Sequence, residues 1–169
     1  MFSTQINRRQ FLTAGRNQAV SPLRPPWSIN EADFQDACTR CGDCLSACPE
    51  NILIREGVNG YPIVDFKRGE CTFCTDCVKA CPSTALAESD ARPWLLKAVV
   101  GKSCLAKQQV ICTTCAEQCE LRAIRFTPLA GAIAQPEINL DVCTGCGACD
   151  APCPAQAIEM LRSEVRDVQ

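Results

Sequence analysis

Short apolar segments separated by turn residues recur along the chain and predict short strands. In the first half, residues 52–55 and 62–65 flank a turn that contains Gly57, Asn59 and Gly60. This pattern is typical of a β-hairpin. In the second half, residues 123–126 and 137–140 flank a loop with Gly131 and predict a second hairpin. With short helices and loops around these strands, we expect an α+β fold.

The C-terminal end shows a different period. Ile158, Leu161, Val165 and Val168 recur at three- and four-residue spacing, which predicts a C-terminal helix or tail over residues 159–169. Its apolar face would pack on the core or on a partner helix. No stretch of about 18 apolar residues occurs, so we expect no membrane-spanning helix.

Composition points to a fold that is not held by aliphatic packing alone. Of the 169 residues 47% count as hydrophobic, but 16 are cysteine and many others are alanine. The larger apolar side chains would make a thin core for this length. There is no histidine, which excludes histidine acid–base catalysis, Rieske-type clusters and the usual catalytic zinc sites. We therefore expect no enzyme activity.

Net charge excludes a further class of function. The formal charge is −2 and the pI is about 5.2. A protein that binds nucleic acid through its bulk charge carries a strong basic excess instead. We expect no nucleic-acid partner.

The cysteines form four runs along the chain, and three of the runs share the spacing C-x2-C-x2-C-x3-C-P. These regular runs are Cys38, Cys41, Cys44 and Cys48; Cys71, Cys74, Cys77 and Cys81; and Cys143, Cys146, Cys149 and Cys153. Three thiolates spaced this closely on one loop can converge on a compact inorganic cube, while the fourth belongs to the other cluster of a pair. The spacing predicts iron–sulfur clusters.

The third run is irregular. It consists of Cys104, Cys112, Cys115 and Cys119, with seven residues in its first gap and Glu120 in place of the proline. Four cysteines still remain for a four-ligand site. The alternative is that Cys104 is a free thiol and that only three protein ligands hold this cluster.

The sequence supports two other uses of the cysteines, zinc binding and disulfide bonds, less well. Structural zinc sites usually combine two separated C-x2-C pairs rather than a C-x2-C-x2-C triplet. Disulfides fit poorly with ligands three residues apart at this density.

Each half of the chain resembles a bacterial two-cluster 4Fe–4S ferredoxin. The resemblance implies two tandem ferredoxin-like modules with short strands, short helices and cluster-binding loops, and four 4Fe–4S clusters. It also implies that each module exchanges its fourth cysteines. The implied ligand sets are set A (Cys38, Cys41, Cys44, Cys81), set B (Cys48, Cys71, Cys74, Cys77), set C (Cys104, Cys112, Cys115, Cys153) and set D (Cys119, Cys143, Cys146, Cys149).

A second repeat helps to place the domains. Arg24-Pro25-Pro26-Trp27 precedes the first run, and Arg92-Pro93-Trp94 precedes the third run. We infer that each half begins with an arm whose tryptophan covers the apolar side of that half, unless the two pairs coincide by chance. The predicted domains are an N-terminal arm (1–30), a first two-cluster module (31–88), a linker and second module (89–158), and the C-terminal segment (159–169).

The whole chain also resembles a narrower family, the ferredoxin-type proteins NapF of periplasmic nitrate-reduction systems. The matching features are N-R-R-Q-F-L from Asn7, R-P-P-W-S from Arg24, the four runs and the irregular third run. This resemblance implies a cytoplasmic protein that transfers single electrons. It also implies action with the cytoplasmic precursor of the nitrate reductase catalytic subunit during its maturation. The alternative functions are an electron-transfer subunit of a larger dehydrogenase and a cluster-assembly factor. The alternative partner is another redox protein.

Arg8 and Arg9, followed by Phe11 and Leu12, look like a twin-arginine export signal. An export signal also needs an apolar region and a cleavage site, and the residues that follow include Arg16 and further polar side chains. We therefore expect the protein to stay in the cytoplasm. The motif either docks to machinery that handles such signals or is a solvated basic tail.

Overall fold

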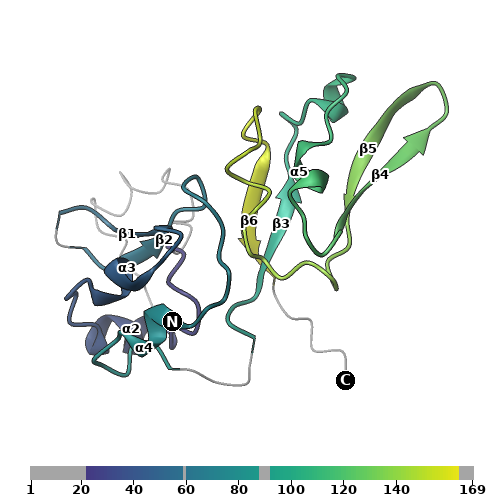
Figure 1. Cartoon of the computed structure of the whole chain (residues 1–169). Coiled ribbons are helices and arrows are strands. Elements are labelled where there is room, and N and C mark those ends of the chain that lie inside the picture. Colours follow the sequence, from purple (N-terminus) through teal and green to yellow (C-terminus); the bar gives the residue numbers. More distant parts are fainter. Residues whose placement is uncertain (1–21, 59, 88–91, 164–169) are drawn as a thin grey trace, which may run out of the picture.

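The computed structural model describes residues 22–58, 60–87 and 92–163. The described chain forms an N-terminal half (residues 22–87) and a C-terminal half (residues 92–163) that lie side by side (Figure 1). Short helices and two-stranded antiparallel sheets make up both halves. The expectation of an α+β fold with short elements is confirmed. The twin-arginine-like motif lies outside the described residues.

The N-terminal half contains the first predicted hairpin. Strands β1 (Leu53–Arg55) and β2 (Pro62–Val64) pair with Leu53 opposite Val64, which confirms that prediction. Three short helices surround it: α2 (Glu31–Ala37), α3 (Asp43–Ala47) and α4 (Asp76–Lys79). Helix α2 begins at Asn30, whose side chain accepts from the Asp33 N–H, and it buries Phe34 completely. The cap and the single aromatic anchor explain why so short a helix forms here.

The C-terminal half contains the second predicted hairpin in a longer form. Strands β4 (Ile124–Leu129) and β5 (Ala132–Ile138) pair around the turn at Gly131, which confirms the second hairpin. The helix α5 (Thr114–Glu117) and the 3₁₀ helix η1 (Ala106–Gln108) precede it. Strand β3 (Leu96–Val100), which the sequence did not predict, pairs with β6 (Ile158–Arg162).

The predicted C-terminal helix is wrong over the residues that the structure describes. Residues Ile158–Arg162 form strand β6, in which Ile158 and Met160 are buried while Glu159 and Leu161 are exposed. This period of two follows from pairing with β3, where Leu96 and Ala98 are buried on the same alternation. Residues 164–169, with Val165 and Val168, lie outside the described residues.

One hydrophobic core runs through both halves. Its buried members include Phe34, Ile52, Phe66, Leu96, Ile124 and Ile158. Four cysteines are buried with them, one from each run: Cys44, Cys77, Cys115 and Cys149. These four thiols are therefore part of the core itself.

The arm before the first run is anchored by a buried arginine. Arg24 is 6% exposed, and its guanidinium donates to Glu31 at 2.7 and 2.9 Å and to the Pro62 carbonyl at 3.2 Å. It also lies 5.2 Å from the centre of the Phe34 ring. The hydrogen bond raises the pKa of Arg24 and lowers the pKa of Glu31. This network ties the arm to α2 and β2.

The two Pro-Trp segments meet each other. The backbone N–H of Trp27 donates to the Pro93 carbonyl at 2.8 Å. Trp27 packs edge-on against Phe73 of its own half. The expectation that each tryptophan covers its own half does not describe Trp94, because this ring contacts Phe66 and Phe73 across the boundary. The second segment therefore helps to join the halves.

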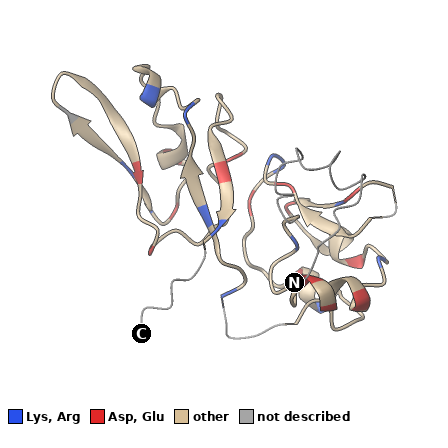
Figure 2. Cartoon of the chain, turned by 180° about the vertical axis from the view of Figure 1, so that it is seen from behind, with Lys and Arg blue, Asp and Glu red and all other residues tan. Residues whose placement is uncertain are grey.

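Charged side chains do not form a single basic surface over the described chain. Lys, Arg, Asp and Glu residues are interspersed over both halves (Figure 2). None of the helices in the described ranges has the length and apolar character needed to cross a membrane.

Candidate metal centres

Each of the four implied ligand sets lines a cavity of its own. Sets A, B and C line three cavities with no cysteine from another set, and set D lines a fourth cavity together with Cys71. Each set combines three cysteines of one run with one from the other run of the same half, and only the cavity of set D adds a cysteine of the other half. The structure thus brings together all sixteen predicted site residues in the crossover arrangement.

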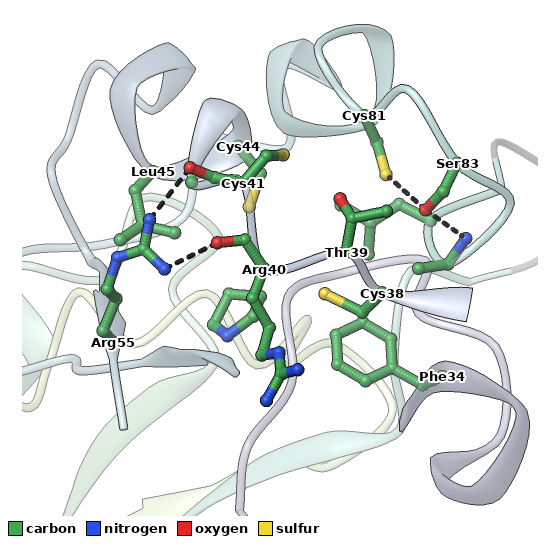
Figure 3. A pocket seen from close by; sticks show the side chains of 14 residues that line it. Phe34, Cys38, Thr39, Arg40, Cys41, Cys44, Leu45, Arg55, Cys81 and Ser83 are labelled. Atoms are coloured by element: carbon green, nitrogen blue, oxygen red, sulfur yellow. Dashed lines mark hydrogen bonds between the residues drawn. The ribbon is translucent and has the colours of Figure 1, made fainter. Parts of the chain in front are cut away.

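Set A shows how the local structure orients the thiols. The Cys38, Cys41, Cys44 and Cys81 sulfur atoms face the space between the first run and the end of the second run (Figure 3). Arg55 of β1 donates to the carbonyls of Arg40 and Cys41 at 2.7 and 2.9 Å. A side chain on Gly42 would collide with the Arg55 guanidinium, since an added Cβ would lie 2.3 Å from Nη2. The glycine lets the hairpin hold the loop.

The regular runs share an unusual backbone conformation. In each of them the residues before and after the second cysteine have positive φ angles: Arg40 and Gly42, Phe73 and Thr75, and Gly145 and Gly147. Changes of hand between neighbouring residues turn successive N–H groups toward one side and form concavities that bind anions, including iron–sulfur clusters. A cluster with cysteine ligands carries net negative charge, so the loops fit such a group.

The irregular third run reaches its set by a different route. Helix η1 lies within the seven-residue gap between Cys104 and Cys112, and its Ala106 is completely buried. The Gln135 side chain of β5 donates to the Ala106 carbonyl at 2.7 Å. The long β4–β5 hairpin therefore supports the insertion, while Val110 and Ile111 beside Cys112 remain exposed.

Burial and mutual repulsion both act on the thiols. Burial raises the pKa of Cys44 to about 12, and the neighbouring Cys77 and Cys81 thiolates add to this. Burial likewise raises the pKa of Cys71, Cys77 and Cys149 to about 12 and that of Cys115 to about 11. Metal coordination deprotonates thiols and removes this penalty by supplying positive charge.

The Trp27 side chain gives independent evidence that the cavity lined by set B suits a hydrogen-bond acceptor. The indole Nε1 of Trp27 is buried and has no hydrogen-bond partner among the described residues. Trp27 lines the same cavity as set B. Because buried donors are normally paired, a group with acceptor sulfurs in this cavity fits the residues present.

The zinc alternative requires a tighter arrangement. A tetrahedral zinc site with bonds of about 2.3 Å places its sulfurs only about 3.8 Å apart. Over residues 22–58, 60–87 and 92–163, no three His, Cys, Asp or Glu side chains are grouped closely enough for a single metal ion.

Sequence reasoning missed the side chains that hold the loops. Besides Arg55, these include Lys97 of β3, whose ammonium donates to the carbonyls of Leu140 and Cys143 at 2.5 Å. A basic residue was the only signal in the sequence. It is too common to indicate a loop contact more than forty positions away.

Comparisons with known proteins show which family the chain belongs to. A model of the 4Fe–4S dicluster domain matches residues 37–85, and a model of the 4Fe–4S binding domain matches residues 136–159. The chain is 46% identical over 152 residues to the ferredoxin-type protein NapF of Escherichia coli (strain K12), covering 90% of the chain and 92% of that protein. The chain belongs to the NapF family of ferredoxin-type proteins.

Two further relatives bear on this family. The NapF protein of Haemophilus influenzae is 46% identical over 165 residues, covering 92% of the chain and 93% of that protein. The ferredoxin-type protein NapG of Escherichia coli is 37% identical over 162 residues, covering 82% and 70%. The predicted family is confirmed, and the NapF-type chain is a 4Fe–4S ferredoxin-type protein with two matched iron–sulfur domains.

Proposed function

We propose that the chain binds four 4Fe–4S clusters through sets A to D in two tandem two-cluster modules and carries single electrons in the cytoplasm. One observation supports this most strongly: each crossover set lines one cavity. Two 4Fe–4S domain matches and the NapF relatives agree with it. When bound, such clusters supply reversible one-electron transfer.

The chain's own residues bind and shield the clusters. The sixteen thiolates hold the iron, and Cys44, Cys77, Cys115 and Cys149 do so from within the core. The left-handed residues of the regular runs suit loops whose backbone N–H groups lower the cost of the negative charge. Four thiolate ligands for each cluster leave no position for a substrate, so the proposed role is electron transfer and not catalysis.

The partner in this proposal is the cytoplasmic precursor of the catalytic subunit of a periplasmic nitrate reductase. The family resemblance supports it, because NapF-type proteins belong to nitrate-reduction systems. The chain would supply electrons or help to install the iron–sulfur cluster of that subunit before export. An electron-transfer subunit of a larger dehydrogenase, or a cluster-assembly factor without a redox role, is the alternative.

A pull-down under anaerobic conditions tests the partner. The cluster-loaded chain is mixed with the nitrate reductase catalytic subunit that keeps its signal segment, and with the processed subunit as the matched control. We expect retention of the precursor well above that of the processed form. Equal or absent retention of both, with elution of the chain in a stable large complex from cell extract, would instead favour the dehydrogenase subunit.

The twin-arginine-like motif is tested in the same assay. We propose that Arg8 and Arg9 contribute to docking, since the motif stands without the apolar region that export requires. Replacing both with alanine should weaken retention of the precursor and leave the visible spectrum of the clusters unchanged. Unchanged retention would assign the segment to a solvated basic tail.

A further inference from the structure

The boundary between the halves passes directly between two of the proposed centres. The Cys71 N–H of set B donates to the Cys146 carbonyl of set D at 2.8 Å. Residues 70–73 line the cavity of set B and also the cavity of set D. A single four-residue segment is therefore the shared wall of two cavities that belong to different halves.

Side chains close to residues 70–73 hold the two halves together, and we call these contacts the clamp. Phe66 is 4% exposed and packs so closely on Gly147 that an added Cβ there would lie 2.0 Å from the ring. Lys67 forms an ion pair with the buried Asp150. A buried carboxylate that loses its partner is costly. This pair therefore resists separation of the halves.

Aromatic rings close the other side of the same boundary. The Trp94 ring lies 5.7 Å from both Phe66 and Phe73, measured between ring centres. Its Nε1 donates to the Thr144 carbonyl, within the fourth run, at 3.3 Å. Aromatic contacts and hydrogen bonds thus join the halves beside the two sets, which is the opposite of a solvated linker.

Within each half, the two sets are also neighbours through buried thiols. Cys44 of set A and Cys77 of set B lie on the packed helices α3 and α4. Cys115 of set C and Cys149 of set D are both buried in the same hydrophobic core. Contacts within and between the halves therefore arrange the sets in the order A, B, D, C.

We propose that electrons pass between the two halves through residues 70–73, which we call the junction. The four sets then form one electron-transfer chain with sets A and C at its ends. This inference rests on the proposed four-cluster function. One electron from a one-electron donor protein enters at one end, crosses the Cys71–Cys146 contact, and leaves to a one-electron acceptor protein at the other end. No proton moves, and no bond is made or broken.

Magnetic coupling between reduced clusters tests the junction, because it falls steeply with distance. The full chain is purified anaerobically, reduced with a photoreduced flavin, and examined by electron paramagnetic resonance. The test variant is Phe66→Ala/Lys67→Met, which removes the clamp without touching a ligand. The control is Arg68→Met, which removes an exposed arginine from an ion pair with Asp65 inside the N-terminal half.

We expect the control to keep the interaction spectrum of the unchanged chain. The double variant should lose the part of the interaction that crosses the boundary, keep its iron and sulfide, and exchange the amide hydrogens of residues 66–74 about tenfold faster or more. An unchanged interaction spectrum, or unchanged exchange, in the double variant overturns the junction. A chain without iron and sulfide would instead overturn the proposed function.

Discussion

At the scale of single residues, the loops carry a conformational cost that the cysteines explain. Arg40, Phe73 and Thr75 are left-handed without being glycine, at a cost of roughly 1–2 kcal/mol each. Such residues persist where the surroundings enforce them, and they gather at functional sites. Convergence of the neighbouring thiols on one cavity is the constraint that enforces them here.

Replacing Thr75 with glycine should relieve part of this cost. The equivalent positions in two other runs are already glycine, at Gly42 and Gly147. We expect Thr75→Gly to stabilise the loaded protein by about 1 kcal/mol, measured as a higher temperature for loss of the visible cluster absorbance. Thr72→Gly is the control, because Thr72 lies on the same loop without a positive φ. Stabilisation by both variants, or by neither, would contradict the account.

Trp27 should tune the centre beside it. Hydrogen bonds to cluster sulfurs favour the more negative, reduced state and raise the reduction potential. Trp27→Phe removes the buried N–H that has no partner among the described residues and should lower the potential of one centre in a redox titration. Trp94→Phe is the control, since the Trp94 N–H already donates to the Thr144 carbonyl. Equal shifts in the two variants would show that ring size, and not the donor, matters.

At the scale of elements, each helix and strand is too short to be stable alone. The described helices have three to seven residues and the strands three to seven. Isolated helices of this length, and isolated two-stranded hairpins, are marginal in water. Their positions therefore depend on the core and on the cavities that they surround.

The support of the third run by β5 should be visible in cluster retention. Gln135→Ala removes the hydrogen bond to the Ala106 carbonyl at 2.7 Å, a loss of about 1 kcal/mol that should speed iron loss several-fold. Iron release to a chelator measures this. Gln108→Ala is the control, because the Gln108 side chain makes only an exposed contact of 3.5 Å to the Lys102 carbonyl. Equal rates of iron release from Gln135→Ala and from the unchanged chain would contradict the support of the third run by β5.

Patterns of neighbouring residues predicted the hairpins, but they did not predict the pairing of strands that are far apart in the sequence. Both hairpins were predictable because short apolar segments flank nearby glycine-containing turns. Strand β6 was mistaken for a helix because Ile158 and Leu161 are three apart, although Leu161 is 42% exposed. Its pairing with β3 joins segments about sixty residues apart. No local periodicity encodes that pairing.

The same division holds for the candidate sites. Cysteine spacing allowed the four sets to be anticipated through the ferredoxin resemblance, because three ligands of each regular run share one short loop. The Lys67–Asp150 pair and the Cys71–Cys146 contact link segments more than seventy residues apart. They depend on how the halves dock, which spacing within a run does not determine.

At the scale of the whole molecule, one core with four cysteine-lined cavities spans both halves. Four buried thiols take positions that aliphatic side chains fill in other domains. Without iron, the thiols of each set would repel one another whenever they ionise. Stability of the two halves should therefore depend on the same loading step.

Removal of iron should unfold the chain. Anaerobic chelation of the reduced protein is expected to abolish the cooperative thermal transition in circular dichroism, and reconstitution with iron and sulfide should restore it. The untreated chain carried through the same buffers is the control. A cooperative transition in the iron-free chain would show that the aliphatic core is sufficient.

The central claim is that sixteen cysteines hold four 4Fe–4S clusters. Iron, acid-labile sulfide and zinc measured together in the anaerobically purified full-length chain test it most directly. The account predicts about 16 iron and about 16 sulfide per chain, with zinc well below one per chain. A folded chain that contains stoichiometric zinc, or only about half of that iron and sulfide, would contradict it.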